Sequence, residues 1–198
     1  MVIFKENQLI MKYCYVLFFA TFTAFAQYDY EPSEAFPYGR PNPEAPQQLT
    51  DFQPLIGKCK CTSTTRKTDG TWNEPVEMTW VFKYIMNGMA VQDETFKMDQ
   101  TFAGSIRQFS KDSSAWYVHY YSSGATPATL STWKGNKNEQ GDIILYNAQK
   151  APNGADGFYK ITFYNMSNEG FDWLGEWVNP DETIIYPTWE IHCKKEKN

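Results

Sequence analysis

The sequence predicts an all-β protein, a closed up-and-down antiparallel barrel of about ten strands with a short N-terminal helix. Turn signals recur at hairpin spacing, and the runs between them show the two-residue alternation typical of strands. No segment after residue 57 carries the apolar stripe of a helix. Because an open meander leaves two unpaired edges and closure removes them, we favour a barrel over a sandwich.

The expected elements begin with one short helix over residues 47–54. Pairs such as Asp69-Gly70 and Asn87-Gly88 then mark turns, since these residues tolerate the positive φ that tight hairpins need. The predicted strands are residues 56–66, 77–85, 88–98, 103–110, 114–121, 128–134, 142–149, 158–165, 171–178 and 188–194.

Two segments precede the predicted barrel domain, residues 49–198. Residues 1–26 have a basic start at Lys12, a short apolar run and a small-residue site at Ala24-Phe25-Ala26, the pattern of a signal peptide with its true start at Met11. We expect an exported protein, periplasmic or extracellular, that is not integral to a membrane after cleavage. Residues 27–48 hold five prolines and predict a linker, with a free spacer favoured over a segment lying along the domain.

Composition narrows the function classes. The chain has 198 residues, 17% of them aromatic and 21% charged, so it can bury the core of one domain. A net charge of −5 argues against nucleic acid as a partner. Neither a nucleophile elbow nor a phosphate-binding loop is present.

Three cysteines lie in the predicted domain. Cys59 and Cys61 share a face of the first strand, and Cys193 lies on the last strand, which is the neighbour of the first in a closed barrel. A disulfide from Cys193 to Cys59 or Cys61 would staple this seam in an oxidising compartment. We favour it over a metal site, because His192 points to the face opposite Cys193.

Two stretches of the chain resemble a known family. Residues 52–59, Phe-Gln-Pro-Leu-Ile-Gly-Lys-Cys, are similar to the opening of lipocalin-like barrels, where a helix leads into a Gly-x-Trp strand. Residues 80–94, Trp-led with an Asn-Gly turn and an acidic second strand, resemble an exported calycin-type family of unknown function. The resemblance spans about residues 49–194 and implies a barrel with an interior cavity. It departs at Cys59, which stands where the family has Trp.

Nitrobindin-like and fatty-acid-binding-like barrels are more distant relatives under this resemblance. The former bind haem through a histidine near the C-terminus, and His192 lies near that end. Their glycine-rich first-strand signature is missing here, and His192 groups with the outward residues of its strand. We therefore expect no haem, and no other cofactor is indicated.

The strand alternation also nominates ligand-binding side chains. Glu94 shares a face with Gln92, and Asp93 lies opposite, so one of the two acids is expected to face the cavity. An inward Arg107 would form a buried pair with an acid or clamp a ligand carboxylate. The residues we nominate for ligand binding are Trp80, Gln92, Glu94, Arg107, Tyr120, Trp133 and Trp173.

Three functions fit this picture. The first is an exported protein that binds a small apolar or amphipathic molecule in an aromatic-lined cavity, without catalysis. The second is a barrel enzyme in which Glu94 or Asp93 acts as a general base, with Arg107, Tyr117 or Tyr120 as its electrophilic partner. The third is a domain whose side chains fill its own cavity and which acts through its surface.

Overall fold

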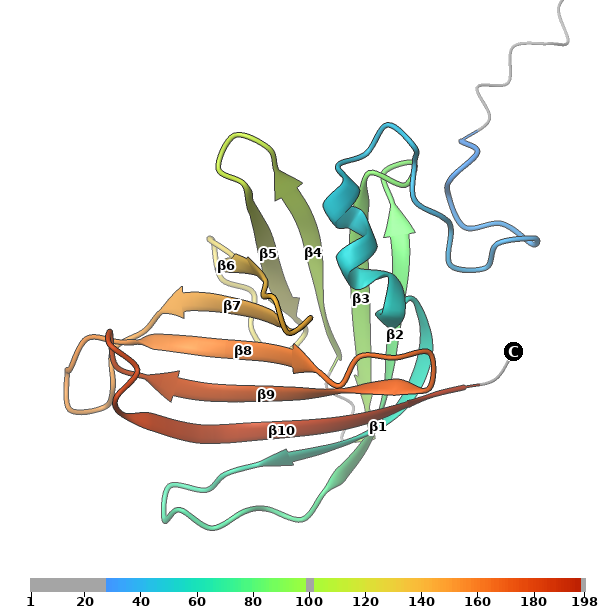
Figure 1. Cartoon of the computed structure of the whole chain (residues 1–198). Coiled ribbons are helices and arrows are strands. Elements are labelled where there is room, and N and C mark those ends of the chain that lie inside the picture. The colour runs from blue at the N-terminus through green and yellow to red at the C-terminus, as the bar shows by residue number, and fades with distance from the viewer. Residues whose placement is uncertain (1–27, 99–101, 197–198) are drawn as a thin grey trace, which may run out of the picture.

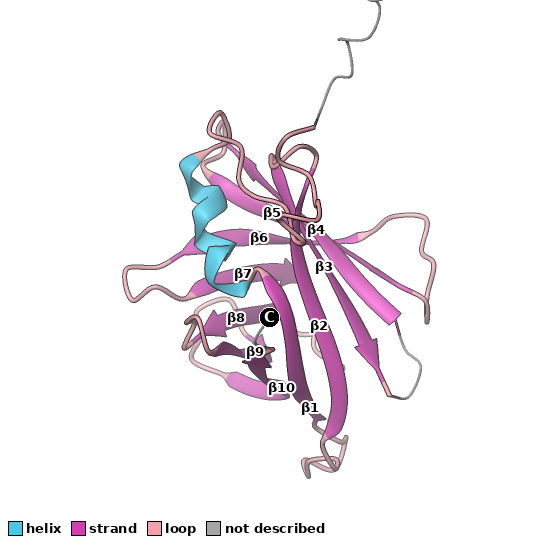
Figure 2. Ribbon diagram, turned by 90° about the vertical axis from the view of Figure 1, so that its right-hand side faces the viewer, coloured by secondary structure: helices cyan, strands magenta, loops and turns pink. Residues whose placement is uncertain are grey.

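The computed structural model describes residues 28–98 and 102–196, which form a closed antiparallel barrel behind a short helix (Figure 1). Around the barrel the strands run β1, β10, β9 and so on down to β2, so each strand pairs with its neighbours in sequence and β1 closes the ring against β10 (Figure 2). The predicted fold class is confirmed. The strands are β1 (Gly57–Thr65), β2 (Val76–Ile85), β3 (Ala90–Lys97), β4 (Phe102–Ser110), β5 (Ala115–Ser122), β6 (Ser131–Lys137), β7 (Ile143–Ala148), β8 (Phe158–Tyr164), β9 (Gly170–Val178) and β10 (Ile185–Lys195).

Alternation along the strands builds the core. In β2 the buried side chains are those of every second residue, Met78, Trp80, Phe82 and Tyr84, while their neighbours are more exposed. The Trp80 and Phe82 rings lie 5.2 Å apart, and both meet rings from β8 and β9 across the barrel. Edge-on and tilted ring packing of this kind adds to the stabilisation that burial itself supplies.

The predicted helix is confirmed as the 3₁₀ helix η1 (Gln47–Leu55). In Figure 1 it lies in front of β3 and above the ends of β8 to β10. Its buried face is Leu49, Phe52 and Leu55. Phe52 packs edge-on against Trp116 at 4.7 Å, and Asp51 Oδ2 accepts a hydrogen bond from Trp116 Nε1 at 3.1 Å. The helix therefore inserts a ring into the barrel and covers one of its ends.

The proline-rich segment is held against the barrel, which corrects the favoured expectation of a free spacer. The Tyr38 carbonyl accepts a hydrogen bond from Tyr84 N at 2.8 Å, and Asn42 N donates to the Gly88 carbonyl at 3.1 Å. Gly88 has φ +76°, and a Cβ there would come within 2.5 Å of the Arg40 carbonyl. A glycine in the β2–β3 turn thus permits both the turn and the contact with the segment. The predicted signal peptide lies outside the described residues.

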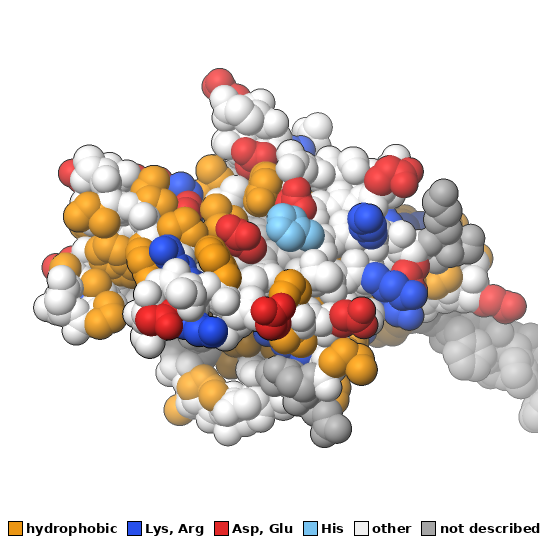
Figure 3. All heavy atoms as spheres, turned by 90° about the horizontal axis from the view of Figure 1, so that it is seen from below, with side chains coloured by type: hydrophobic (Ala, Val, Ile, Leu, Met, Phe, Trp, Pro, Cys, Tyr) orange, Lys and Arg blue, Asp and Glu red, His pale blue; other side chains and the backbone are white. Residues whose placement is uncertain are grey.

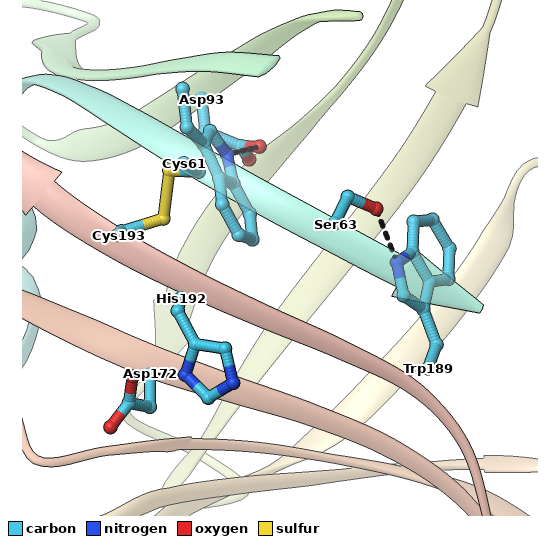
Figure 4. Close-up of a disulfide and its surroundings, with 8 residues drawn as sticks. Cys61, Ser63, Asp93, Asp172, Trp189, His192 and Cys193 are labelled. Carbon is cyan, nitrogen blue, oxygen red and sulfur yellow. Dashed lines mark hydrogen bonds and ion pairs between the residues drawn. A yellow bond between two sulfur atoms is a disulfide. The ribbon is translucent and has the colours of Figure 1, made fainter. Parts of the chain in front are cut away.

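The seam between the first and last strands is bridged by a disulfide. The register places Cys61 opposite Cys193, with Cα atoms 4.1 Å apart, and their sulfur atoms are bonded (Figure 4). Cys59 also points inward and remains a buried free thiol. The predicted disulfide is confirmed, with Cys61 as the partner. In the described part of the chain, no helix has the length and apolar character needed to span a membrane.

Removing the disulfide should destabilise the barrel measurably. The bond joins residues 132 positions apart, and loops of this length constrain the unfolded chain strongly. We expect the double variant C61A/C193A to lose about 2–4 kcal/mol of unfolding free energy in urea titrations. Wild type measured with a reductant should match the variant. Equal urea midpoints with and without reductant would contradict a stabilising bond.

The Cys59 thiol should be unreactive in the folded protein. Burial raises its pKa to about 11, an effect that the nearby Lys195 ammonium only partly opposes. At pH 8 about one thiol in a thousand is then ionised, and the thiolate is the reactive form. We expect Ellman's reagent to label Cys59 only after unfolding in urea. In urea without reductant, Ellman's reagent should detect one thiol per protein comprising residues 28–198. Detection of three thiols would show that the disulfide is absent.

Candidate functional site

A cavity of about 360 Å³ lies inside the barrel, beyond the rings that pack on η1. Its lining includes Lys97 at the end of β3 and Gln149 in the β7–β8 loop, at the end of the barrel away from η1, and we take this end as its mouth. Its volume falls within the range typical of small-molecule sites. The aromatic side chains of its wall are Trp80, Tyr120, Trp133, Tyr159, Phe163, Trp173 and Trp189.

Asp93 is the hub of the polar groups within the cavity. It lies on β3, is 3% exposed, and its carboxylate accepts three hydrogen bonds. Ser105 Oγ donates to Oδ1 at 2.5 Å, Trp80 Nε1 donates to Oδ2 at 2.6 Å, and Arg107 Nη1 donates to Oδ1. The donors come from the strands on either side, because Asp93 pairs in register with Phe82 on β2 and with Ser105 on β4.

Arg107 is the second buried charge and is 2% exposed. Three rings surround its guanidinium, whose carbon lies 5.1 Å from the centre of Phe52, 5.0 Å from Phe82 and 5.7 Å from Phe163. A guanidinium is stabilised by aromatic faces, especially where water is excluded. The pair with Asp93 and these rings together compensate a charge that could not otherwise remain in the core.

Two donors near the cavity have no hydrogen-bond partner among the described residues. They are the buried atoms Arg107 Nε and Trp133 Nε1. Buried polar groups in native proteins are nearly always paired, so these two donors are candidates for a ligand acceptor. Neither nitrogen is exposed to the cavity that its residue lines, so an acceptor could reach it only after the side chain shifts. By contrast, the Trp189 indole is satisfied, because its Nε1 donates to Ser63 Oγ at 2.8 Å across the seam (Figure 4).

The structure places five of the seven nominated residues in the cavity wall: Trp80, Arg107, Tyr120, Trp133 and Trp173. Gln92 and Glu94 lie on the outer face instead, which corrects their nomination. Gln92 Nε2 donates to Tyr121 Oη at 2.8 Å, and Glu94 pairs with Lys83 at 3.3 Å. Asp93 is the acid that faces inward. Whether the five residues bind a ligand stays a prediction.

Sequence reasoning did not nominate Trp189 or Tyr159, although both line the cavity. Trp189 shares the inward face of Cys193 and Ile191 in the sequence alternation, so that signal could have found it. A register shift between Pro187 and Trp189 breaks the alternation just before it. Tyr159 alternates with Ile161 and Phe163, opposite Lys160 and Thr162, so the same signal could have found it.

The outer face carries His192, the histidine whose position near the C-terminus suggested a comparison with haem-binding barrels. His192 is exposed and its Nδ1 lies 2.7 Å from Asp172 Oδ1, on the side of the sheet away from the disulfide (Figure 4). Seen from below, charges of both signs are interspersed, and hydrophobic side chains gather at the left, where the β9–β10 loop lies (Figure 3). Exposed Ile184, Ile185 and Tyr186 belong to that end. In the described part of the chain, no three His, Cys, Asp or Glu side chains are grouped to hold a metal ion.

Comparison with solved structures supports the barrel fold. Rv2717c from M. tuberculosis superposes with a TM-score of 0.52 at 8% identity, covering 78% of this chain and all of that one. The S-type phycobiliprotein lyase CPES from Guillardia theta gives a TM-score of 0.40 at 9% identity, over 74% of this chain and 91% of its own. No family model and no curated protein matches the sequence. The likeness to Rv2717c shows the fold alone, one that fits a lipocalin-like barrel.

Replacing one partner of the buried ion pair should destabilise the fold more than replacing both. Asp93→Asn leaves the Arg107 charge uncompensated, and we expect a loss of about 3–5 kcal/mol of unfolding free energy. Arg107→Met alone should have a similar effect. The double variant D93N/R107M removes both charges and should lose less than the sum of the single changes, as a double-mutant cycle in urea would measure. Additive losses would show that the two residues do not interact.

Proposed function

We propose that this protein is an exported binding protein, which takes up a small apolar or amphipathic molecule in the barrel cavity. The observation that carries the proposal is an aromatic-walled cavity with a few buried polar groups inside it. Small-molecule sites have this composition, because apolar walls supply affinity while a few polar groups fix orientation. The disulfide supports an oxidising compartment.

The cavity volume supports a ligand of modest size. About 360 Å³ corresponds to about twelve water molecules at about 30 Å³ each. A compound of two or three fused rings has similar bulk. Burying such a compound against several aromatic side chains is enough for micromolar affinity after the cost of association. This unfilled volume also favours binding over a barrel packed by its own side chains.

The alternative of acid–base catalysis has less support. A general base needs a lone pair that can reach the substrate proton, and three hydrogen bonds, one of them from Arg107, leave the Asp93 carboxylate only one of about four. Glu94 lies outside the cavity, paired with Lys83. Tyr117 also lies outside, with its ring 5.6 Å from the Lys134 amine. Of the candidate partners, Arg107 and Tyr120 line the cavity, and Arg107 is already paired with Asp93.

A fluorescent probe tests the proposal directly. N-phenyl-1-naphthylamine is neutral, fits the estimated bulk and brightens in apolar surroundings. We expect saturable binding in the micromolar range by fluorescence titration. Ala103→Trp places an indole in the cavity and should weaken binding at least tenfold, because it occupies the probe's space.

The matched control is Gln108→Trp, which adds the same side chain to an exposed position on the same strand. It should leave the affinity within about twofold of wild type. Circular dichroism and urea titration should show that both variants fold. If the two variants bind equally well, the probe is bound at the surface, and the proposal of a cavity ligand fails.

A further inference from the structure

We infer, building on the proposed function, that the cavity selects a neutral aromatic molecule that accepts hydrogen bonds, such as an aryl ketone. It should discriminate against a hydrocarbon of the same shape and against the corresponding carboxylate. Three features of the buried polar groups support this choice: which donors are unpaired, which acceptors are occupied, and how the charges balance.

The unpaired buried groups at the cavity are donors only. An indole nitrogen and a guanidinium nitrogen carry hydrogens and accept nothing, so Trp133 Nε1 and Arg107 Nε can be satisfied only by an acceptor. Both residues lie in one cross-strand row, because Arg107 pairs with Val118 and Val118 pairs with Trp133. Their strands are thus about 10 Å apart, so one bicyclic ligand can contact both residues, and a shift of either side chain would turn its N–H onto the ligand.

The strongest acceptor in the cavity is already occupied. Asp93 accepts from Ser105 and Arg107 at one oxygen and from Trp80 at the other. The remaining carboxylate lone pair offers little to a ligand that donates hydrogen bonds. A ligand acceptor, by contrast, meets donors that have nothing else to bind, and specificity is greatest where a site would otherwise hold unpaired polar groups.

The charge balance favours a neutral ligand. Arg107 is neutralised by Asp93, and both are at least 97% buried. A carboxylate beside this pair would leave one uncompensated negative charge in the core, which is strongly unfavourable. Lys97 is the other cation of the lining, but it lies at the mouth with its amine 4.4 Å from the Trp189 ring. Lys97 lies four residues along β3 from Asp93, about 13 Å between the two backbones, so an anion beside the ion pair is poorly placed to bind its amine.

Three naphthalenes of matched size test the inference. 2-Acetylnaphthalene carries one neutral acceptor, 2-ethylnaphthalene carries none, and 2-naphthoate carries an anion. Isothermal titration at pH 7.5 should give the ketone about a tenfold advantage in dissociation constant over the hydrocarbon, the size expected of one well-placed hydrogen bond. The ketone should also bind at least tenfold more tightly than the carboxylate.

A matched pair of variants identifies the donor. Trp133→Phe removes the unpaired indole N–H and keeps an aromatic ring, so the preference for the ketone over the hydrocarbon should fall to about threefold or less. Trp189→Phe removes an indole N–H that is already donated to Ser63, and it should leave the preference unchanged. Both positions line the same cavity, so a general effect of replacing tryptophan would appear in both.

The outcomes separate the two proposals. If the three compounds bind with equal affinity, the cavity binds ligands but does not select acceptors, and the inference is wrong. Tighter binding of 2-naphthoate overturns the preference for neutral ligands. If none binds and none raises the melting temperature, the proposed function itself fails, and the inference fails with it. Equal loss of preference in both variants would overturn the role of Trp133.

Discussion

A buried ion pair between Asp93 and Arg107 organises the interior of this barrel. Its two charges lie on adjacent strands, and the Asp93 carboxylate also accepts hydrogen bonds from Ser105 and Trp80. The rings of Phe52, Phe82 and Phe163 enclose the guanidinium, so residues from η1, β2 and β8 all depend on where Arg107 lies. Because an unpaired charge in the core is so unfavourable, the pair restricts how these elements can be arranged.

The ion pair also divides the barrel in two. On the side of η1 the interior is filled by packed rings, including Phe52 against Trp116. On the other side the cavity widens toward a mouth near Lys97 and Gln149. The polar cluster thus lies between a packed region and an unfilled one. Its unpaired donors give that boundary a chemical preference, which an entirely apolar cavity of the same volume would lack.

Different interactions hold the two ends of the described chain to the barrel. The β1–β10 ladder closes the ring, and the disulfide fixes it covalently. The segment before η1 binds the β2–β3 hairpin through backbone hydrogen bonds at Tyr38 and Asn42. Proline density alone suggested a free linker, since proline resists helix and sheet. Proline still permits the backbone carbonyl of a neighbouring residue to accept hydrogen bonds, and here the β2–β3 hairpin supplies the donor to Tyr38.

The sequence by itself determined the fold class and the strand positions and nominated Trp80 for the interior, because alternation and turn chemistry are local properties. Only the tertiary structure decided the rest. Cys59 and Cys61 share a face, so the choice of Cys61 needed the β1–β10 register. Likewise, Asp93 and Glu94 are adjacent acids in β3, a strand that carries apolar residues on both of its faces. Only the pairing of β3 with β2 and β4 shows which of the two acids points inward. A shift of one residue in register exchanges the two faces, and no local pattern in β3 determines that register.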